Sequence, residues 1–298
     1  MIAVSGSTGL IGSALVDSLR RDGHQIRRMV RSRPSPGSEH ILWDPESGTL
    51  DPGALVGVDA VVHLAGENVG ERWTAEKKAR IRDSRVRGTR LLAEAIAALD
   101  EPPRVLVCAS AVGIYGDRGD EMLDEDSRAG LDFLARVGQE WEAASEPAAE
   151  CGARVVKLRF GVVLSPRGGA LEKMLLPFRI GVGGKVGSGQ QWMSWISLTD
   201  AVAAIRFALE TATLEGPVNT VAPHPVTNAE FTGALGDVLG RPTVMTVPAF
   251  ALRLAYGEMA DATLLASQRA RPRKLQEAGF RFQHPELRDA LRAELADG

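Results

Sequence analysis

Short apolar runs alternate with segments of helical periodicity over the first 164 residues of the chain. The apolar runs are rich in β-branched and small residues, a pattern typical of strands buried on both faces of a parallel sheet. The expected strands are 2–5, 25–30, 41–44, 59–66, 105–110 and 154–158, and the main expected helices are 11–22, 74–99 and 133–150. This alternation predicts an α/β fold, with a Rossmann-type doubly wound parallel sheet and right-handed crossovers.

The pattern changes after about residue 164, where glycines and tryptophans crowd a stretch with few predicted elements. The elements expected beyond it are helices at 198–211, from 227, near 249–257, 261–270 and 286–296, and strands at 217–221 and 243–247. We predict a dinucleotide-binding Rossmann domain formed by residues 1–164, with returning segments near 195–222. Residues 165–194 and 223–298 are expected to form a smaller C-terminal substrate-binding or lid region.

Three regularly spaced glycines lie at the junction of the first strand and the first helix. Gly6 permits a tight turn, Gly9 lets the backbone approach a pyrophosphate, and Gly12 lets the helix pack closely on the strand. The anion would lie on the free N–H groups of the helix N-terminus. A purely structural turn is the alternative, but the strand–turn–helix context favours nucleotide binding. The expected binding segment comprises Gly6, Thr8, Gly9, Leu10, Ile11 and Gly12.

The second strand ends in a basic turn, Arg31-Ser32-Arg33, which contains no acidic residue. NAD-dependent enzymes place an acid near this strand end, where it binds the ribose hydroxyls. A carboxylate repels a 2′-phosphate, whereas a guanidinium can pair with it. The turn therefore favours NADP(H) as the cofactor, with Arg31 and Ser32 as binding candidates. A merely solvated basic turn is the alternative.

Composition and charge narrow the classes of function. The 298 residues are 44% hydrophobic and 24% charged, as in ordinary globular proteins, and a formal net charge of −3 favours neither nucleic acid nor an anionic membrane as a partner. Cys108 and Cys151 lack metal-ligand spacing, so we expect no metal site and a reducing compartment. No apolar run has the length of a membrane helix, and Met1 leads directly into the first strand, so we expect a cytoplasmic protein.

Four motifs occur in order along the first part of the chain. They are the Gly-x-x-Gly-x-x-Gly turn, His-Leu-Ala at 63–65, Arg-Val-x-Gly-Thr at 85–89 and Ser-Ala-x-x-x-Tyr-Gly at 110–116. Together they resemble the extended short-chain dehydrogenase/reductases, the NAD(P)-dependent epimerases and dehydratases. Further stretches, at 66–68, 187–192, 194–196, 219–223 and 226–231, are similar to one poorly characterised epimerase-like group, often labelled sugar-nucleotide epimerase or cell-division inhibitor. The resemblance covers nearly the whole chain but says little about the substrate.

The resemblance implies a cofactor over the carboxyl edge of the sheet, beside Leu64, Ala65 and Gly66. Arg85 stands where the wider superfamily commonly has an asparagine. An arginine there could reach the cofactor, although a surface ion pair is an alternative role. Glu67 and Asn68, just beyond the cofactor-lining strand, are further polar candidates. Lys185 in the glycine-rich segment is another, with a solvated loop lysine as the alternative, and His63 is expected to be a core histidine.

The chain departs from the superfamily at the catalytic residues. The superfamily uses a Tyr-x-x-x-Lys pair, in which the lysine lowers the tyrosine pKa for proton exchange with the substrate. The matching positions here hold Val137 and Trp141, which cannot transfer a proton. The usual serine slot holds Ala111, with Ser110 one residue earlier. Ser110 and Tyr115 are the remaining catalytic candidates, with packing as the alternative role for Tyr115.

Two functions remain open from the sequence. The first is an NADP-dependent oxidoreductase or epimerase with non-standard acid/base residues, acting on an unidentified small polar substrate as a monomer or homodimer. The second is a catalytically inactive NADP(H)-binding redox sensor or regulatory protein. Loss of the Tyr/Lys pair favours the sensor, whereas the glycine- and aromatic-rich C-terminal portion favours an enzyme with a substrate lid.

Overall fold

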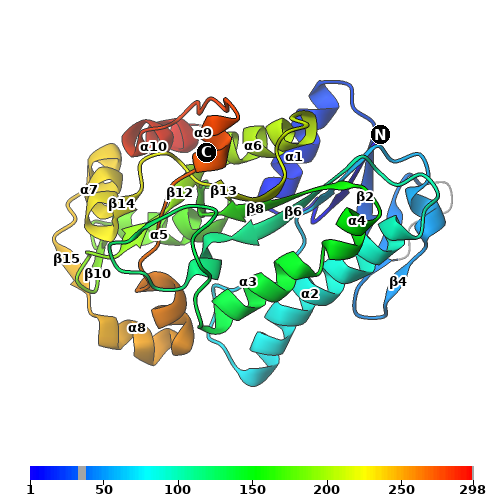
Figure 1. The fold of residues 1–298 in the computed structure, drawn as a ribbon. Coiled ribbons are helices and arrows are strands. Elements are labelled where there is room, and N and C mark those ends of the chain that lie inside the picture. Colours follow the sequence, from blue (N-terminus) through cyan, green and yellow to red (C-terminus); the bar gives the residue numbers. More distant parts are fainter. Residues whose placement is uncertain (33–37, 297–298) are drawn as a thin grey trace.

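The computed structural model describes residues 1–32 and 38–296 and is built on one central sheet (Figure 1). Its strands are β1 Ile2–Ser5, β2 Ile26–Val30, β3 Ile41–Asp44, β4 Thr49–Leu50, β5 Ala60–His63, β6 Val105–Ala111, β8 Arg154–Phe160 and β13 Gly216–Thr220. They lie in the order β13-β8-β6-β5-β1-β2-β3-β4, and all neighbours are parallel except the edge pair β3 and β4. The chain winds outward in both directions from β1, so the predicted doubly wound α/β fold is confirmed.

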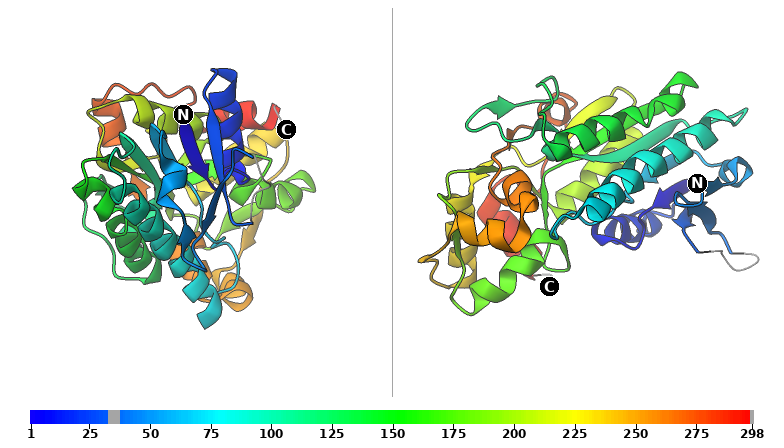
Figure 2. Two further views of the ribbon diagram at one scale, coloured as in Figure 1. Left: turned by 90° about the vertical axis from the view of Figure 1, so that its right-hand side faces the viewer. Right: turned by 90° about the horizontal axis from the view of Figure 1, so that it is seen from below.

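Helices cover both faces of this sheet (Figures 1 and 2). On one face lie α1 Leu10–Arg21 and α6 Leu198–Glu210, and on the other lie α2 Ala75–Ala97, α3 Phe133–Ala143 and α4 Glu146–Glu150. Successive strand residues serve opposite faces, because side chains alternate along a strand. Val4 and Val107 belong to the apolar core beneath α1 and α6, whereas Ala3 and Leu106 belong to the core beneath α2 and α4.

Most elements after β8 gather beyond the carboxyl edge of the sheet (Figure 1). They are β9 Val162–Leu164, α5 Gly169–Arg179, β10 Gly184–Val186, β11 Trp192–Met193, β12 Trp195–Ser197, β14 Val226–Thr227, α7 Asn228–Leu239, β15 Met245–Val247, α8 Ala249–Tyr256 and α10 Leu287–Ala296. Trp195 and Phe231 are fully buried at the centre of a separate apolar cluster in this part. The division into two domains stays a prediction.

Two predicted helices differ from the structure. The helix expected at 133–150 is broken after Ala143, and α4 restarts with Pro147 in its first turn, where the missing N–H is tolerated. The prediction of a helix at 261–270 is wrong. A short π-helical turn, Ala260–Leu264, is followed there by strand β16 Arg269–Ala270, which pairs with β7 Met122–Leu123.

Three further short elements complete the described chain, namely the 3₁₀ turns Pro52–Leu55 and Val112–Tyr115 and the helix α9 Arg273–Glu277. Helix α5 was not predicted, because glycines and Pro177 mask its apolar periodicity. None of the helices within 1–32 and 38–296 combines the length and apolar character needed to cross a lipid bilayer.

Candidate functional site

The turn between β1 and α1 requires glycine at Gly6 for two separate reasons. Its φ of 63° lies in the left-handed region that favours glycine. A Cβ atom there would also lie 2.8 Å from the backbone nitrogen of Ala65, so β5 could not end where it does. Gly6 therefore brings the ends of β1 and β5 into close contact, and the segment 64–66 lies directly beside the glycine turn.

The fold itself requires a glycine at Gly12 but not at Gly9. A Cβ at Gly12 would lie 2.1 Å from the carbonyl oxygen of Gly6, a contact that no side chain can make. At Gly9, φ is −75° and an added Cβ would meet only the Gly6 oxygen, at 3.3 Å. The fold itself therefore fixes Gly12 but tolerates a small side chain at the exposed Gly9. A position that tolerates a side chain in the fold but still holds glycine is expected where a ligand approaches the backbone, as proposed for Gly9.

The N-terminus of α1 is open. Gly9 occupies the N-cap without a side-chain hydrogen bond, and the first turn of α1 contains no acidic residue. The first N–H groups of a helix have no partner inside the helix and carry its positive dipole end, so they attract anions. Thr8 is exposed beside them, and Leu10 and Ile11 are half-buried. The geometry of the predicted binding segment therefore suits a pyrophosphate.

Arg31 and Ser32 are exposed just beyond β2, and Arg33 lies outside the described residues. Asp44 at the end of β3, an acid that was not expected here, lies close enough for the charge of Arg31 to affect it. A hydrogen bond from Ser47 Oγ, one from the Glu46 N–H, and the charge of Arg31 hold the pKa of Asp44 below its usual value. Among the residues that the structure describes, no carboxylate lies within 4.0 Å of the Arg31 guanidinium, so it can pair with another anion.

Arg85 of α2 packs beneath the segment that follows β5. A Cβ at Gly66 would lie 3.3 Å from Arg85 Cζ, and Arg85 Nη1 donates to the carbonyl oxygen of Glu67 at 3.0 Å. Within the described chain no carboxylate lies within 4.0 Å of this guanidinium, so the surface ion pair considered as its alternative role is not formed. Burial lowers the pKa of Arg85 to about 10. Its charge is therefore unpaired at the expected cofactor edge.

Trp141 occupies the position of the superfamily lysine on α3 and packs against neighbouring side chains. Its ring lies under the Arg85 guanidinium, with 5.0 Å between Arg85 Cζ and the ring centroid, and its Nε1 donates to Thr89 Oγ1 at 2.9 Å. A cation over an aromatic face is attracted to it. Val137 and Trp141 are both buried, so both slots of the usual Tyr/Lys pair are used for packing.

Ser110, near the end of β6, is joined to two residues that sequence analysis missed. Its Oγ donates to Glu142 Oε1 at 2.7 Å, and Arg159 at the end of β8 holds both oxygens of Glu142, at 2.7 and 2.8 Å. Burial opposes the charge of Arg159, but hydrogen bonds to Glu142 and its negative charge outweigh this and raise the arginine pKa. Ser110 is 3% exposed, so the Ser110–Glu142–Arg159 network lies almost entirely inside the protein.

Tyr115 lies in the same network but is fully buried, with an exposed fraction of 0%. Its hydroxyl accepts from Arg159 Nη1 at 3.0 Å and lies 2.7 Å from Asn219 Oδ1 and 2.9 Å from the Asp124 carbonyl oxygen. Burial raises the pKa of Tyr115 to about 12, the opposite of the shift that catalysis by a phenolate needs. The geometry supports packing as the role of this residue and leaves Ser110 as the better catalytic candidate.

The polar candidates Glu67 and Asn68 have structural partners. Glu67 accepts from the buried Lys77 at 2.7 Å, and Asn68 Oδ1 accepts from the Gly70 N–H at 2.9 Å. His63 is buried, with its Nδ1 2.6 Å from Ser5 Oγ, as expected of a core histidine.

The comparisons with known proteins agree with this geometry. Residues 2–221 match the model of the NAD dependent epimerase/dehydratase family, and residues 247–294 match a domain of unknown function, DUF1731. Epimerase family protein Mb2239 of Mycobacterium bovis is 49% identical over 292 residues, covering 98% of this chain and 96% of the relative. Epimerase family protein YfhF of Bacillus subtilis is 38% identical over 300 residues, covering 99% and 98%. The crystal structure of human epimerase family protein SDR39U1 (isoform 2) with NADPH matches with a TM-score of 0.91 and 36% identity, covering 100% of this chain and 99% of that chain. The chain therefore belongs to the NAD dependent epimerase/dehydratase family.

Proposed function

We propose that this protein binds NADP(H) across the carboxyl edge of its sheet. The observation that carries the proposal is the β1–α1 turn, in which Gly12 is demanded by the fold, whereas Gly9 has room that a phosphate can use. The uncapped N-terminus of α1 would receive the pyrophosphate, and Arg31 with Ser32 would receive the 2′-phosphate. That a human relative was crystallised with NADPH supports the same choice.

The nicotinamide end of the cofactor is expected near Leu64, Ala65, Gly66 and Arg85. There the bound cofactor would supply hydride transfer at its nicotinamide ring. Leu64 and Ala65 form the wall beside Gly6, and the unpaired charge of Arg85 adds an attraction for the anionic cofactor.

We infer that the protein is an epimerase or oxidoreductase for a small polar substrate and that Ser110 and Glu142 take the place of the usual acid/base residues. Glu142 accepts the Ser110 hydrogen bond, so the serine oxygen keeps lone pairs with which to accept a hydrogen bond from a substrate hydroxyl. As Ser110 takes the substrate proton, its own proton passes to Glu142. Arg159 fixes the orientation of the Glu142 carboxylate through a bidentate contact. A carboxylate hydrogen-bonded to a hydroxyl is an arrangement that general-base catalysis uses.

A redox sensor that binds NADP(H) without turnover is the second candidate function. The buried Val137 and Trp141 favour it, because they fill the usual proton-transfer positions with packed side chains. In either case we expect a small-molecule ligand rather than nucleic acid or membrane, and a monomeric or homodimeric protein.

The test is turnover of a panel of nucleotide sugars and small carbonyl compounds. Net reduction is followed by the loss of NADPH absorbance, and epimerisation, which consumes no NADPH, is followed by chromatography of the sugar products. We expect slow turnover that Ser110→Ala and Glu142→Gln each reduce about 10²–10⁴-fold. Glu140→Gln is the matched control, because Glu140 lies on the same helix and pairs with Arg82 at the surface. Turnover that both site variants retain would remove Ser110 and Glu142 from the mechanism. Tight NADPH binding with no turnover across the panel would favour the sensor.

A further inference from the structure

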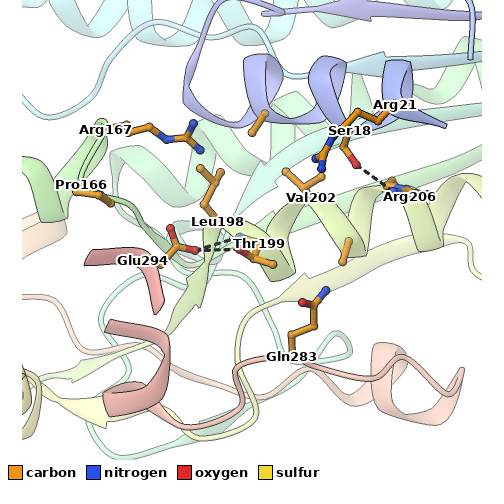
Figure 3. Close-up of a pocket in the computed structure, with 12 residues that line it drawn as sticks. Ser18, Arg21, Pro166, Arg167, Leu198, Thr199, Val202, Arg206, Gln283 and Glu294 are labelled. Atoms are coloured by element: carbon orange, nitrogen blue, oxygen red, sulfur yellow. Dashed lines mark hydrogen bonds between the residues drawn. The ribbon is translucent and has the colours of Figure 1, made fainter. Parts of the chain in front are cut away.

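A cavity separate from the candidate site lies between α1 and α6. It has a volume of about 320 Å³ and is enclosed by α1, α6, the 166–167 segment and α10 (Figure 3). A volume near 300 Å³ is at the lower end of small-molecule sites. Its polar and charged lining includes Arg21, Arg167, Arg206, Thr199, Gln283 and Glu294. The cavity is lined by α1, the 166–167 segment, α6, Gln283 and α10, five segments of the chain, so it is a product of the complete fold.

Three guanidinium groups line this one cavity (Figure 3). Arg206 is partly engaged, because it donates to Ser18 Oγ at 2.9 Å and pairs with Asp22. For Arg21 and Arg167, no carboxylate of the described chain lies within 4.0 Å. Like charges that share a cavity without enough counter-charge repel one another, and a bound anion relieves that repulsion.

The floor of the cavity contains a buried acceptor, Glu294, with an exposed fraction of 7%. Its Oε1 accepts hydrogen bonds from the N–H of Thr199 at 3.1 Å and from Thr199 Oγ1 at 3.3 Å. Burial raises the pKa of Glu294, and this single carboxylate faces three arginines across the cavity. The remaining oxygen of Glu294 and the Gln283 amide can hydrogen-bond a neutral polar group of a ligand.

We propose that this cavity is a binding site for a small organic anion, one that carries a phosphate or carboxylate together with a hydroxyl group. Arg21 and Arg167 bind the anionic group, Arg206 completes the positive wall, and Glu294 with Gln283 binds the hydroxyl end. The site is separate from the proposed cofactor cradle, because it uses the later turns of α1 through Ser18 and Arg21 rather than the glycine turn. It therefore goes beyond NADP(H) binding and does not depend on it.

The experiment titrates the protein with inorganic phosphate and with malate by calorimetry. We expect saturable binding of at least one of them, and the double variant R21Q/R167Q should weaken it at least about tenfold, the effect of losing one charged hydrogen bond. Arg20→Gln is the matched control: Arg20 is the exposed neighbour of Arg21 on α1, does not line the cavity, and its loss should leave the affinity unchanged.

Gly9→Ala separates this site from the cofactor cradle. If the cavity is the site, anion affinity in Gly9→Ala matches the unaltered protein, whether or not that protein binds NADPH. The proposal is overturned if neither anion binds saturably, if R21Q/R167Q binds as the unaltered protein does, or if Gly9→Ala abolishes the binding. Preference for phosphate over malate, or the reverse, identifies the anionic group of the ligand.

Discussion

Gly9 and Gly12 lie three residues apart in the same turn, yet the same substitution to alanine should affect them in opposite ways. At Gly12 the new Cβ would be 2.1 Å from the Gly6 carbonyl oxygen, which belongs to the backbone and cannot rotate away. Such overpacking costs about 3 kcal/mol or more, and alanine recovers about 1 kcal/mol through helix propensity. We therefore expect Gly12→Ala to lower the free energy of unfolding by about 2 kcal/mol or more.

Gly9→Ala should leave the fold almost unchanged. Its φ and ψ of −75° and 176° are extended values open to alanine, and its Cβ would lie 3.3 Å from the Gly6 oxygen. A lower entropy of the unfolded chain favours alanine by about 0.4–1 kcal/mol, while its poorer N-capping has the opposite effect. The free energy of unfolding should then change by less than about 1 kcal/mol. NADPH affinity should nevertheless fall at least about tenfold, because the Cβ occupies space needed by the pyrophosphate.

Urea unfolding and NADPH calorimetry on both variants give the two quantities separately. We expect the Gly9→Ala variant to be stable but to bind NADPH poorly, and the Gly12→Ala variant to be destabilised. Unchanged NADPH affinity in a folded Gly9→Ala protein would show that the phosphates do not approach Gly9. Unchanged stability in Gly12→Ala would show that the turn relaxes more easily than its geometry indicates.

Three further predictions follow from single residues. Arg31→Asp should reduce the preference for NADPH over NADH about 10–100-fold, the equivalent of about 1.5–3 kcal/mol, and an unchanged calorimetric ratio would exclude Arg31 from 2′-phosphate binding. Burial lowers the pKa of His63 to about 4, so the unfolded chain binds more protons than the folded one below about pH 6.5. The free energy of unfolding, measured with urea, should therefore fall by about 2 kcal/mol between pH 7 and pH 5, and by less in His63→Gln. The same pH dependence in both proteins would contradict this. Tyr115→Phe should lower stability by about 1–3 kcal/mol, because it leaves the buried Asn219 Oδ1 without a donor and removes one of two acceptors of Arg159 Nη1, while any turnover persists. Lost turnover in a folded variant would restore Tyr115 as a catalytic candidate.

The central sheet and the glycine turn could be predicted from sequence because their signals are local. Buried parallel strands appear as continuous apolar runs, and the spacing of Gly6, Gly9 and Gly12 is set within seven residues of chain. The later part was harder to predict. Its short strands pair over long sequence distances, as in β16 with β7, so the apolar residues at 261–270 were mistaken for a helix.

The interior of the candidate site could not be predicted for the same reason. Glu142 and Arg159 are 17 residues apart, and Tyr115 and Asn219 are 104 residues apart, so no spacing rule connects them. A weak signal existed in Arg159, because a charged residue at the end of a buried strand needs a partner. The sequence showed what was lost at Val137 and Trp141, but the Ser110–Glu142–Arg159 network beside them required the fold.

We propose that the glycine turn and Arg31 together make the protein selective for NADP(H). Calorimetric titration of the unaltered protein with NADPH and with NADH measures this selectivity. We expect NADPH to bind about ten- to a hundredfold more tightly than NADH, because one bidentate charged contact to the 2′-phosphate contributes about 1.5–3 kcal/mol. Equal affinities for the two cofactors, or no binding of either, would contradict it.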